Sequence, residues 1–298
     1  MKKKTVQNNA LMRKATFASI FTAIALIVLK FMTFVLTGSM AMLSTLLDSI
    51  QDSMTSFINF IAVKHATEPA DKEHRFGHGK AQALGGAAQG IIIAIASFLL
   101  ICESISRLFE PKFITDIGLG IAITGIAIVA TFFLVRFQKY VIKKTNSLSI
   151  KADMLHYEGD ILMNVGVIVS MVLSYYLKWT FIDSLFGIAV GLYLLHVVYT
   201  ILKESVGMLM DTEMPGFVRD EITKIALSHK DVHEIYDLKT RQSGEDIFIQ
   251  FCIRLDQELT LKKAHDITDE LECQIRKVIP DSAVIIHPEP LLKKENNI

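Results

Sequence analysis

MAMLSTLLDSIQDSMTSFINFIAV, residues 40–63, is long and apolar enough to cross a membrane, yet it contains Asp48 and Asp52. A second such stretch, SIKADMLHYEGDILMNVGVIVSMVLSYYL, residues 149–177, contains His156 and Asp160. Both pairs have i, i+4 spacing, so each pair projects from one face of its helix. A charged side chain at mid-bilayer costs roughly 2.5–3.5 kcal/mol on insertion scales, which makes these residues functional candidates.

The four residues offer three carboxylates and one imidazole, a donor set that suits a four-coordinate divalent metal. Zinc accepts mixed histidine and carboxylate ligands in tetrahedral geometry. Cadmium, ferrous iron and cobalt stay open, since geometry and availability decide selectivity more than ligand type does. Magnesium and calcium are less favoured because the set is not purely oxygen. A structural ion pair made by His156 is the alternative, but it leaves too much negative charge without a cation.

The hydrophobic residues are unevenly spread along a chain of 298 residues with a mean hydropathy of +0.39. Stretches of about 20 apolar residues predict spanning helices. We find such stretches at residues 15–36, 40–63, 81–108, 113–135, 149–177 and 181–210. Short turns are expected at Gly38-Ser39, Glu110-Pro111 and Lys178-Trp179. The sequence therefore predicts an all-α, six-helix transmembrane bundle over residues 15–210, preceded by a leader at residues 1–14.

Lys and Arg gather on one side of the predicted bundle. They occur in the leader, in residues 64–80 and in residues 136–151, whereas the opposite side has only Arg107, Lys112 and Lys178. The positive-inside rule then predicts cytoplasmic termini. The leader lacks the short apolar core and cleavage site of a signal peptide. A formal net charge of zero argues against a nucleic-acid surface.

Residues 211–290 read as a soluble cytoplasmic domain with charges throughout, followed by a tail at residues 291–298. The pattern predicts a helix at 216–228, strands at 232–239 and 246–255, a helix at 260–278 and a strand at 282–287. This order indicates a small α+β domain with a ferredoxin-like look. The cysteines Cys102, Cys252 and Cys273 have no CxxC spacing, so no disulfide framework is expected.

The loop DKEHRFGHGK, residues 71–80, is a second candidate metal site through Asp71, His74 and His78. Its two glycines argue against a continuous helix, but a loop can also fold its ligands around one ion. A solvated polar loop is the alternative. Lys80 and Asp211 could pair at the boundary between membrane and cytoplasm, although two solvated charges are the commoner situation.

The predicted soluble domain contains Cys252, His265, His287 and Glu289 as further candidate ligands. Taken singly, a strand cysteine is usually a core residue and a lone histidine is usually a surface residue. Lys30, in the first span, is expected to extend its ammonium group to the outer interface.

Four motifs, LLDSIQD, PADKEHRFGHGKA, KADMLHYEGD and DLKTRQSG, resemble the cation diffusion facilitator family, most closely its bacterial YiiP-type zinc and iron efflux members. The resemblance runs from about residue 12 to residue 290. It implies a homodimer in a bacterial plasma (inner) membrane that exchanges a cytoplasmic divalent cation for protons. It also implies a transport site, a loop site and a charge interlock near the dimer interface. These fall on Asp48, Asp52, His156 and Asp160; on Asp71, His74 and His78; and on Lys80 and Asp211.

The soluble domain departs from the family pattern, which has a binuclear site with several histidines and an aspartate. Two of those histidine positions fall on Tyr236 and Cys252, and the aspartate falls on Glu289, whereas His265 and His287 match. The resemblance therefore implies either no metal or one ion held by Cys252, His265, His287 and Glu289. Zinc is then the cargo and a candidate structural ion, and no prosthetic group is expected.

The sequence thus predicts a proton-coupled antiporter that exports divalent transition metals, with zinc first and cadmium or ferrous iron as alternatives. An aspartate at position 48, where a histidine could stand, favours a site less selective for zinc over cadmium. A membrane-anchored metal sensor is the competing class and would bind metal without moving it. An intramembrane zinc enzyme is disfavoured because the chain has no HExxH and the four ligands leave no position for water.

Overall fold

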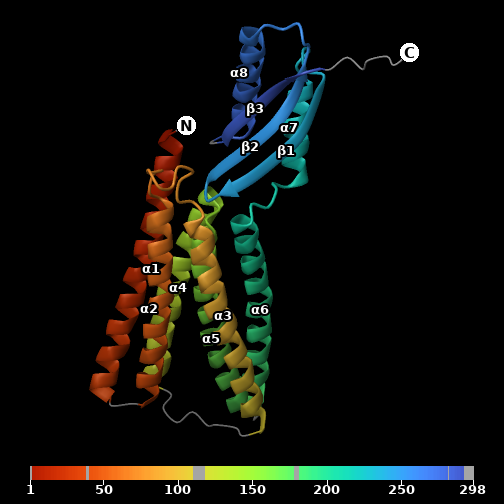
Figure 1. Ribbon diagram of the computed structural model, residues 1–298. Helices are drawn as coiled ribbons and strands as arrows, with labels where there is room; N and C mark the ends of the chain where they lie inside the picture. Colours follow the sequence, from red (N-terminus) through yellow and green to blue (C-terminus); the bar gives the residue numbers. More distant parts are fainter. Residues whose placement is uncertain (1, 38–39, 110–117, 178–180, 281, 292–298) are drawn as a thin grey trace. The chain divides into compact units, whose positions relative to one another are not determined.

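The computed structural model describes residues 2–37, 40–109, 118–177, 181–280 and 282–291 (Figure 1). The chain divides into two compact units, residues 6–206 and residues 207–298 together with 1–5. We describe each unit by itself. The three predicted turns at Gly38-Ser39, Glu110-Pro111 and Lys178-Trp179 lie outside the described residues, as does the tail from residue 292.

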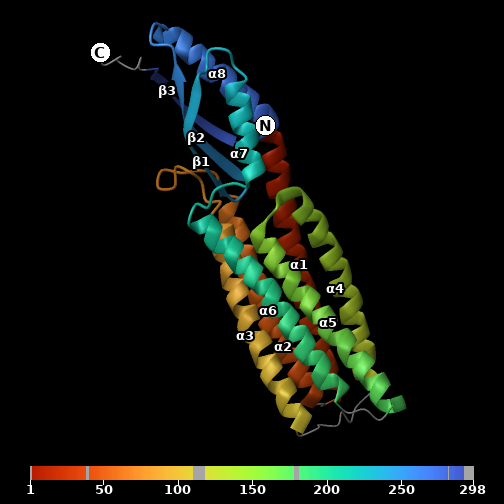
Figure 2. The same ribbon diagram turned by 90° about the vertical axis from the view of Figure 1, so that its right-hand side faces the viewer.

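Long helices make up the first unit (Figures 1 and 2). They are α1 (Lys2–Thr37), α2 (Met40–Ala66), α3 (Ala81–Phe109), α4 (Gly118–Thr145), α5 (Leu148–Leu177) and α6 (Ile182–Leu209). Within the described residues, four of them, α1, α3, α4 and α6, have stretches long and apolar enough to cross a membrane. The two that do not, α2 and α5, carry the predicted acidic ligands. The count of six membrane-crossing spans stays a prediction.

The helices of this unit turn apolar side chains outward and polar side chains inward. Phe21, Phe98 and Phe133 are exposed, whereas Ser19 and Gln138 are fully buried. An exposed apolar surface is stable in lipid, and polar groups in membrane helices usually face the interior of the bundle. This distribution is the one expected of a membrane-embedded helical unit. Because α5 packs against α2, α3 and α4, its polar face is enclosed by neighbouring helices.

Two glycines allow helices to approach closely. A Cβ atom at Gly85 of α3 would collide with Ala62 of α2, and one at Gly191 of α6 would lie 2.5 Å from Cγ1 of Ile101 in α3. Small residues at such contacts are typical of membrane helices, whose association depends on close packing. The backbone of α3 is thereby held against both α2 and α6.

The second unit is an α+β domain with a small sheet, as the sequence predicts. Its elements are α7 (Gly216–Leu227), β1 (Glu234–Ser243), β2 (Asp246–Leu255), α8 (Leu261–Val278) and β3 (Ser282–Pro290). The strand order is β1-β2-β3, with β1 antiparallel and β3 parallel to β2. The parallel pair is joined by α8, as such a crossover requires. Side chains from α7 and α8 pack on the inner face of the sheet, formed by Ile249, Phe251 and Ile253.

The β1–β2 hairpin differs from the sequence prediction, which ended the first strand at residue 239 and placed the turn at Gln242-Ser243-Gly244. In the structure Ser243 pairs with Asp246, so the turn consists of the two residues between them, and Gly244 has φ 63°. Two-residue hairpin turns require such positive φ values, which glycine adopts without strain. The polar C-terminal end of β1 adopts a strand conformation because it pairs with the apolar start of β2. Local propensity cannot predict this pairing, because the partner lies in another segment.

Candidate metal centre

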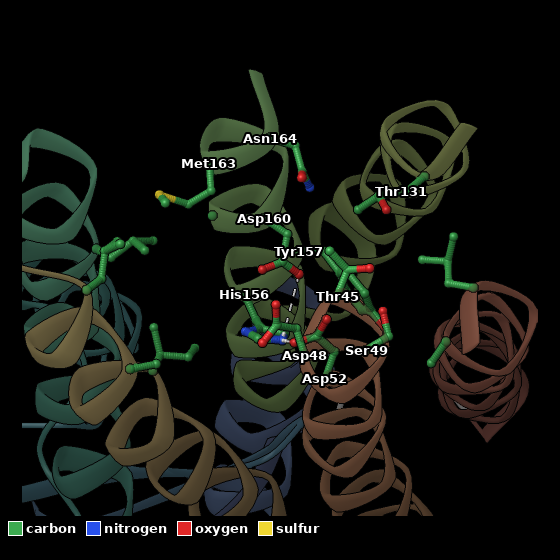
Figure 3. A pocket seen from close by; sticks show the side chains of 18 of the residues that line it. Thr45, Asp48, Ser49, Asp52, Thr131, His156, Tyr157, Asp160, Met163 and Asn164 are labelled. Atoms are coloured by element: carbon green, nitrogen blue, oxygen red, sulfur yellow. Dashed lines mark ion pairs between the residues drawn. The ribbon is translucent and has the colours of Figure 1, made fainter. Parts of the chain in front are cut away.

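Asp52 from α2 and His156 and Asp160 from α5 meet in a cavity inside the helical unit (Figure 3). His156 Nε2 lies 3.2 Å from Asp52 Oδ1 and 3.8 Å from Asp160 Oδ2. This nitrogen is buried and forms no hydrogen bond within the described part of the chain. One ligand atom from each residue lies within 4.8 Å of the other two. A buried nitrogen without a hydrogen bond, facing two carboxylates, is an arrangement that a divalent cation can satisfy.

Asp48 lines the same cavity, one helical turn before Asp52 (Figure 3). It does not belong to the group of three whose ligand atoms converge. The cavity has a volume of about 360 Å³, which exceeds the space needed for one ion and several waters. The structure therefore brings three of the four predicted ligands together and places the fourth on the wall of the cavity they share.

Lys30 does not extend to the outer interface, and our sequence prediction for it is wrong. Its Nζ donates a hydrogen bond of 2.6 Å to Oγ of Ser49 and one of 3.1 Å to the carbonyl oxygen of Thr45, both on α2. It lines the same cavity as the acidic residues. Snorkelling is the usual behaviour of a lysine near a helix end, but here nearby carboxylates and two acceptors in the cavity attract the ammonium group.

The loop between α2 and α3 brings Asp71, His74 and His78 together without forming a helix. His74 Nδ1 lies 3.6 Å from Asp71 Oδ1, His78 Nε2 lies 3.3 Å from Asp71 Oδ2, and the two rings lie 4.6 Å apart. The turn depends on Gly77, which has φ 81° and donates its N–H to the carbonyl oxygen of His74. One ligand atom from each of the three residues lies within 4.8 Å of the others.

Asp71 is held as a carboxylate by the backbone of its own loop. Its Oδ1 accepts hydrogen bonds from the N–H groups of His74 at 2.6 Å and Glu73 at 2.8 Å. These bonds lower the pKa of Asp71 below its ordinary value, and the bond from the N–H of His74 has the largest effect. The loop therefore presents a preformed anionic ligand between two imidazoles.

Comparison with known proteins shows the family to which the chain belongs. The cation efflux transmembrane domain matches residues 16–210, and the cation efflux cytoplasmic domain matches residues 214–291. The chain belongs to the cation efflux family. Its relatives include the cation-efflux pumps FieF of Salmonella paratyphi A and Salmonella arizonae, which are 39% and 38% identical over 280 residues. Both alignments cover 94% of this chain and 93% of the relative.

A solved structure of the metal-bound C-terminal domain of the CzcD transporter from Thermotoga maritima is 28% identical. It matches 28% of this chain and 100% of its own length, with a TM-score of 0.26. As a member of the cation efflux family, the protein is a multi-pass membrane transporter that exports metal cations, and it is not an enzyme. The intramembrane enzyme considered above is thereby excluded.

Asp153, which our sequence analysis passed over, is the most buried acid of this cation efflux protein's helical unit among the described residues. Its Oδ2 accepts hydrogen bonds from Ser19 Oγ at 2.6 Å and from Gln138 Nε2 at 2.7 Å. Its Oδ1 accepts one from Ser56 Oγ at 3.3 Å. These partners belong to α1, α4 and α2, so Asp153 joins three helices to α5.

The same network reaches the cavity. The Ser56 hydroxyl lies 2.7 Å from the hydroxyl of Tyr157, which lines the cavity beside His156. A signal for Asp153 exists in the sequence, because it precedes His156 by three residues and so shares its helix face. The i, i+4 pattern that singles out His156 and Asp160 does not include Asp153.

The candidate ligands of the cytoplasmic domain are divided between one face of the sheet and helix α8. Cys252, His287 and Glu289 alternate with inward-facing residues and so lie on the face opposite α8. Cys252 pairs in register with His287, and His287 Nε2 lies 3.7 Å from Glu289 Oε1. His265 is exposed on α8, with its Nε2 3.7 Å from Asp269 Oδ2. In the described residues of this domain no three ligand atoms converge.

Tyr236 in β1 pairs in register with Cys252 in β2, which in turn pairs with His287 in β3. The nearby carboxylate of Glu289 raises the pKa of Tyr236 to about 12. The side chain is then a neutral phenol at physiological pH and no anionic ligand for zinc.

Lys80 and Asp211 belong to different units of the chain. Lys80 directly precedes α3, and the Asp211 carboxylate lies 3.4 Å from Nη1 of Arg241 in β1. Asp211 therefore has a partner within its own domain, and the interlock between Lys80 and Asp211 stays a prediction.

Proposed function

We propose that this member of the cation efflux family is a proton-coupled antiporter that exports divalent transition metals, zinc first, with cadmium and ferrous iron as alternatives. The observation that carries the proposal is the convergence of Asp52, His156 and Asp160 in a cavity within the helical unit. The protein acts as a homodimer of six-span protomers in a bacterial inner membrane, with both termini in the cytoplasm.

The transport site consists of Asp48, Asp52, His156 and Asp160. Mixed carboxylate and imidazole ligands in a group of four suit tetrahedral zinc. Metal binding requires ionised carboxylates and a neutral imidazole nitrogen, so metal and protons compete for the same atoms. This competition is the chemical basis of exchange: metal displaces protons on the cytoplasmic side, and protons displace metal on the other side.

Exchange of this kind needs two conformations that differ in their affinity for the metal. We propose that the helices rock around the site, as in other transporters whose binding site lies near the middle of the membrane. The close contacts at Gly85 and Gly191 support movement of α3 together with the helices it touches.

The loop residues Asp71, His74 and His78 form a second metal site at the cytoplasmic side. The cytoplasmic domain serves dimerisation, and its Cys252, His265, His287 and Glu289 hold one ion or none. The division of these four residues between the sheet and helix α8 supports a domain that associates through packing more than through zinc.

Zinc flux across a membrane tests the proposal. Proteoliposomes that contain a zinc-sensitive dye should take up external zinc faster when their lumen is acidic, and the lumen should become more alkaline as zinc enters. An ionophore that dissipates the pH gradient should slow the uptake. Stoichiometric zinc binding without uptake would indicate a sensor. A rate of zinc uptake that does not depend on the pH gradient would contradict proton coupling.

The loop site makes a separate prediction. Asp71→Asn keeps an acceptor oxygen for the N–H groups of Glu73 and His74 but removes the charge between the two imidazoles. We expect the zinc affinity of the loop to fall about tenfold or more, as is typical when a group that supports a metal site is removed. Titration calorimetry of the purified chain measures the change.

His65→Ala is the matched control, because His65 is a nearby exposed histidine that pairs only with Glu68, at 3.3 Å, among the contacts described for it. It should leave all zinc affinities unchanged. Equal effects of the two substitutions would show that the loop binds no metal.

A further inference from the structure

Lys30 is a cation inside the cavity that the acidic residues line. It reaches the cavity from α1, whereas Asp48 and Asp52 come from α2 and Asp160 comes from α5. All three acidic residues line the same cavity as Lys30. Two hydrogen bonds, to Ser49 Oγ at 2.6 Å and to the carbonyl oxygen of Thr45 at 3.1 Å, fix its position.

These bonds give the ammonium group a defined place against α2. Thr45 and Ser49 share one face of α2 with Asp48 and Asp52, so Lys30 is held against the face that carries both aspartates. A protonated lysine has no lone pair with which to bind a metal. Its contribution to the cavity is therefore a fixed positive charge.

The charges in the cavity balance only when this lysine is included. Asp48, Asp52 and Asp160 bring three negative charges, and a divalent ion with a neutral His156 brings two positive charges. One negative charge is then left, and the ammonium group of Lys30 neutralises it. An uncompensated charge within a membrane is costly, so the loaded site is most stable inside the helical unit when it is neutral.

We propose that Lys30 is the built-in counter-cation of the transport site, matching its charge to divalent cargo and weakening metal binding enough for release. The proposal rests on the proposed function in one respect, that the cavity residues bind the transported metal. The ammonium group repels the incoming ion and attracts the same carboxylates, so it competes with the cargo. Without it, the carboxylates would hold the metal more tightly and discharge it more slowly.

A structural tether is the competing role for Lys30. In that case the hydrogen bonds to Ser49 and Thr45 would matter because they join α1 to α2, and the charge would not. The two roles differ in the expected direction of metal affinity. Loss of a counter-cation tightens binding, whereas loss of a tether loosens the cavity and weakens binding or leaves it unchanged.

Four variants of the full-length chain in lipid nanodiscs separate these roles, each in an Asp71→Asn background that weakens the loop site. Lys30→Met removes the charge at similar size, and Lys30→Gln removes the charge but keeps a donor for Ser49. Lys30→Arg keeps the charge. Ser49→Ala keeps the charge and removes one hydrogen bond of the tether. Zinc affinity is measured at pH 8, where protons compete least.

We expect zinc to bind Lys30→Met and Lys30→Gln about tenfold more tightly than the parent, given the strength of charge interactions at an effective dielectric near 20. Lys30→Arg and Ser49→Ala should stay within about twofold. Proteoliposomes of the two neutral variants should show a lower KM and a lower maximal rate of zinc uptake, because release becomes slow. If either folded neutral variant binds zinc with unchanged or weaker affinity, the counter-cation role is wrong.

Asp160→Asn in the same background distinguishes failure of this inference from failure of the proposed function. If zinc affinity is the same with and without this substitution, the cavity does not bind the metal, and the proposed function fails. If Asp160→Asn loses zinc binding while the neutral Lys30 variants bind like the parent, only the role of Lys30 is overturned.

Discussion

Asp160→Asn should reduce zinc transport to the background of empty liposomes while the protein still folds and assembles. The replacement is nearly isosteric but removes one of the two carboxylates that face His156 Nε2, which lies 3.8 Å from Asp160 Oδ2. A neutral amide oxygen is a far weaker ligand for zinc than a carboxylate, and the remaining charges no longer balance a divalent ion. The rate of zinc uptake under an imposed pH gradient measures the effect.

Glu158→Gln provides a matched control on the same helix. Glu158 lies two residues before Asp160, but its Oε1 accepts a hydrogen bond of 2.9 Å from Lys139 Nζ, away from the cavity lining. This variant should transport zinc at close to the parental rate. Normal uptake by Asp160→Asn would remove Asp160 from the transport site, and equal losses in both variants would point to a general effect of changing acids on α5.

Asp153→Ala should lower the thermal stability of the protein more than any other substitution discussed above. The change leaves Ser19 Oγ and Gln138 Nε2 without their acceptor in a fully buried environment. An unsatisfied buried group costs about 1–3 kcal/mol, and here at least two such groups arise together. Because the partners belong to different helices, we expect the loss to loosen the packing of α1 and α4 on α5.

Thermal unfolding in nanodiscs, with and without zinc, measures this prediction. Asp153→Asn keeps one acceptor oxygen and should lose less stability than Asp153→Ala, whereas Glu158→Gln should lose little because Glu158 is partly exposed. A melting temperature of Asp153→Ala equal to that of the parent would show that the buried network contributes no stability.

Local patterns in the sequence predict the broad architecture and two of the ligand groups. An i, i+4 pair shares a face of any regular helix, so the pairing of His156 with Asp160 follows from helical geometry. Long apolar stretches predict the membrane helices for the same reason, since their length and composition are local properties. The C-terminal α+β order follows from hydrophobic periodicity and turn residues. Even the loop ligands lie close in the chain.

The places where sequence reasoning fails are those that depend on partners far away in the chain. Lys30 could reach either the interface or the cavity, and the acceptors on α2 decide between them. In the sequence Asp153 is one more acidic residue in a helix. Its role becomes visible only in the structure, where Ser19 and Gln138 from two other helices donate hydrogen bonds to it. The β1–β2 turn is displaced because the ladder with β2, and not the propensity of β1, sets the end of the strand.

The sequence by itself determines that this chain enters a membrane and carries acids and a histidine on two of its helices. The reason is that the length of an apolar stretch and the spacing of residues along a helix are properties of single segments. Only the tertiary structure decides that α2 and α5 face one another, so that Asp52 meets His156 and Asp160, while Asp48 and Lys30 line the same cavity. The physical reason is that a charged group in a membrane must find its partners within the protein, and the packing of the helices determines which partners are in reach.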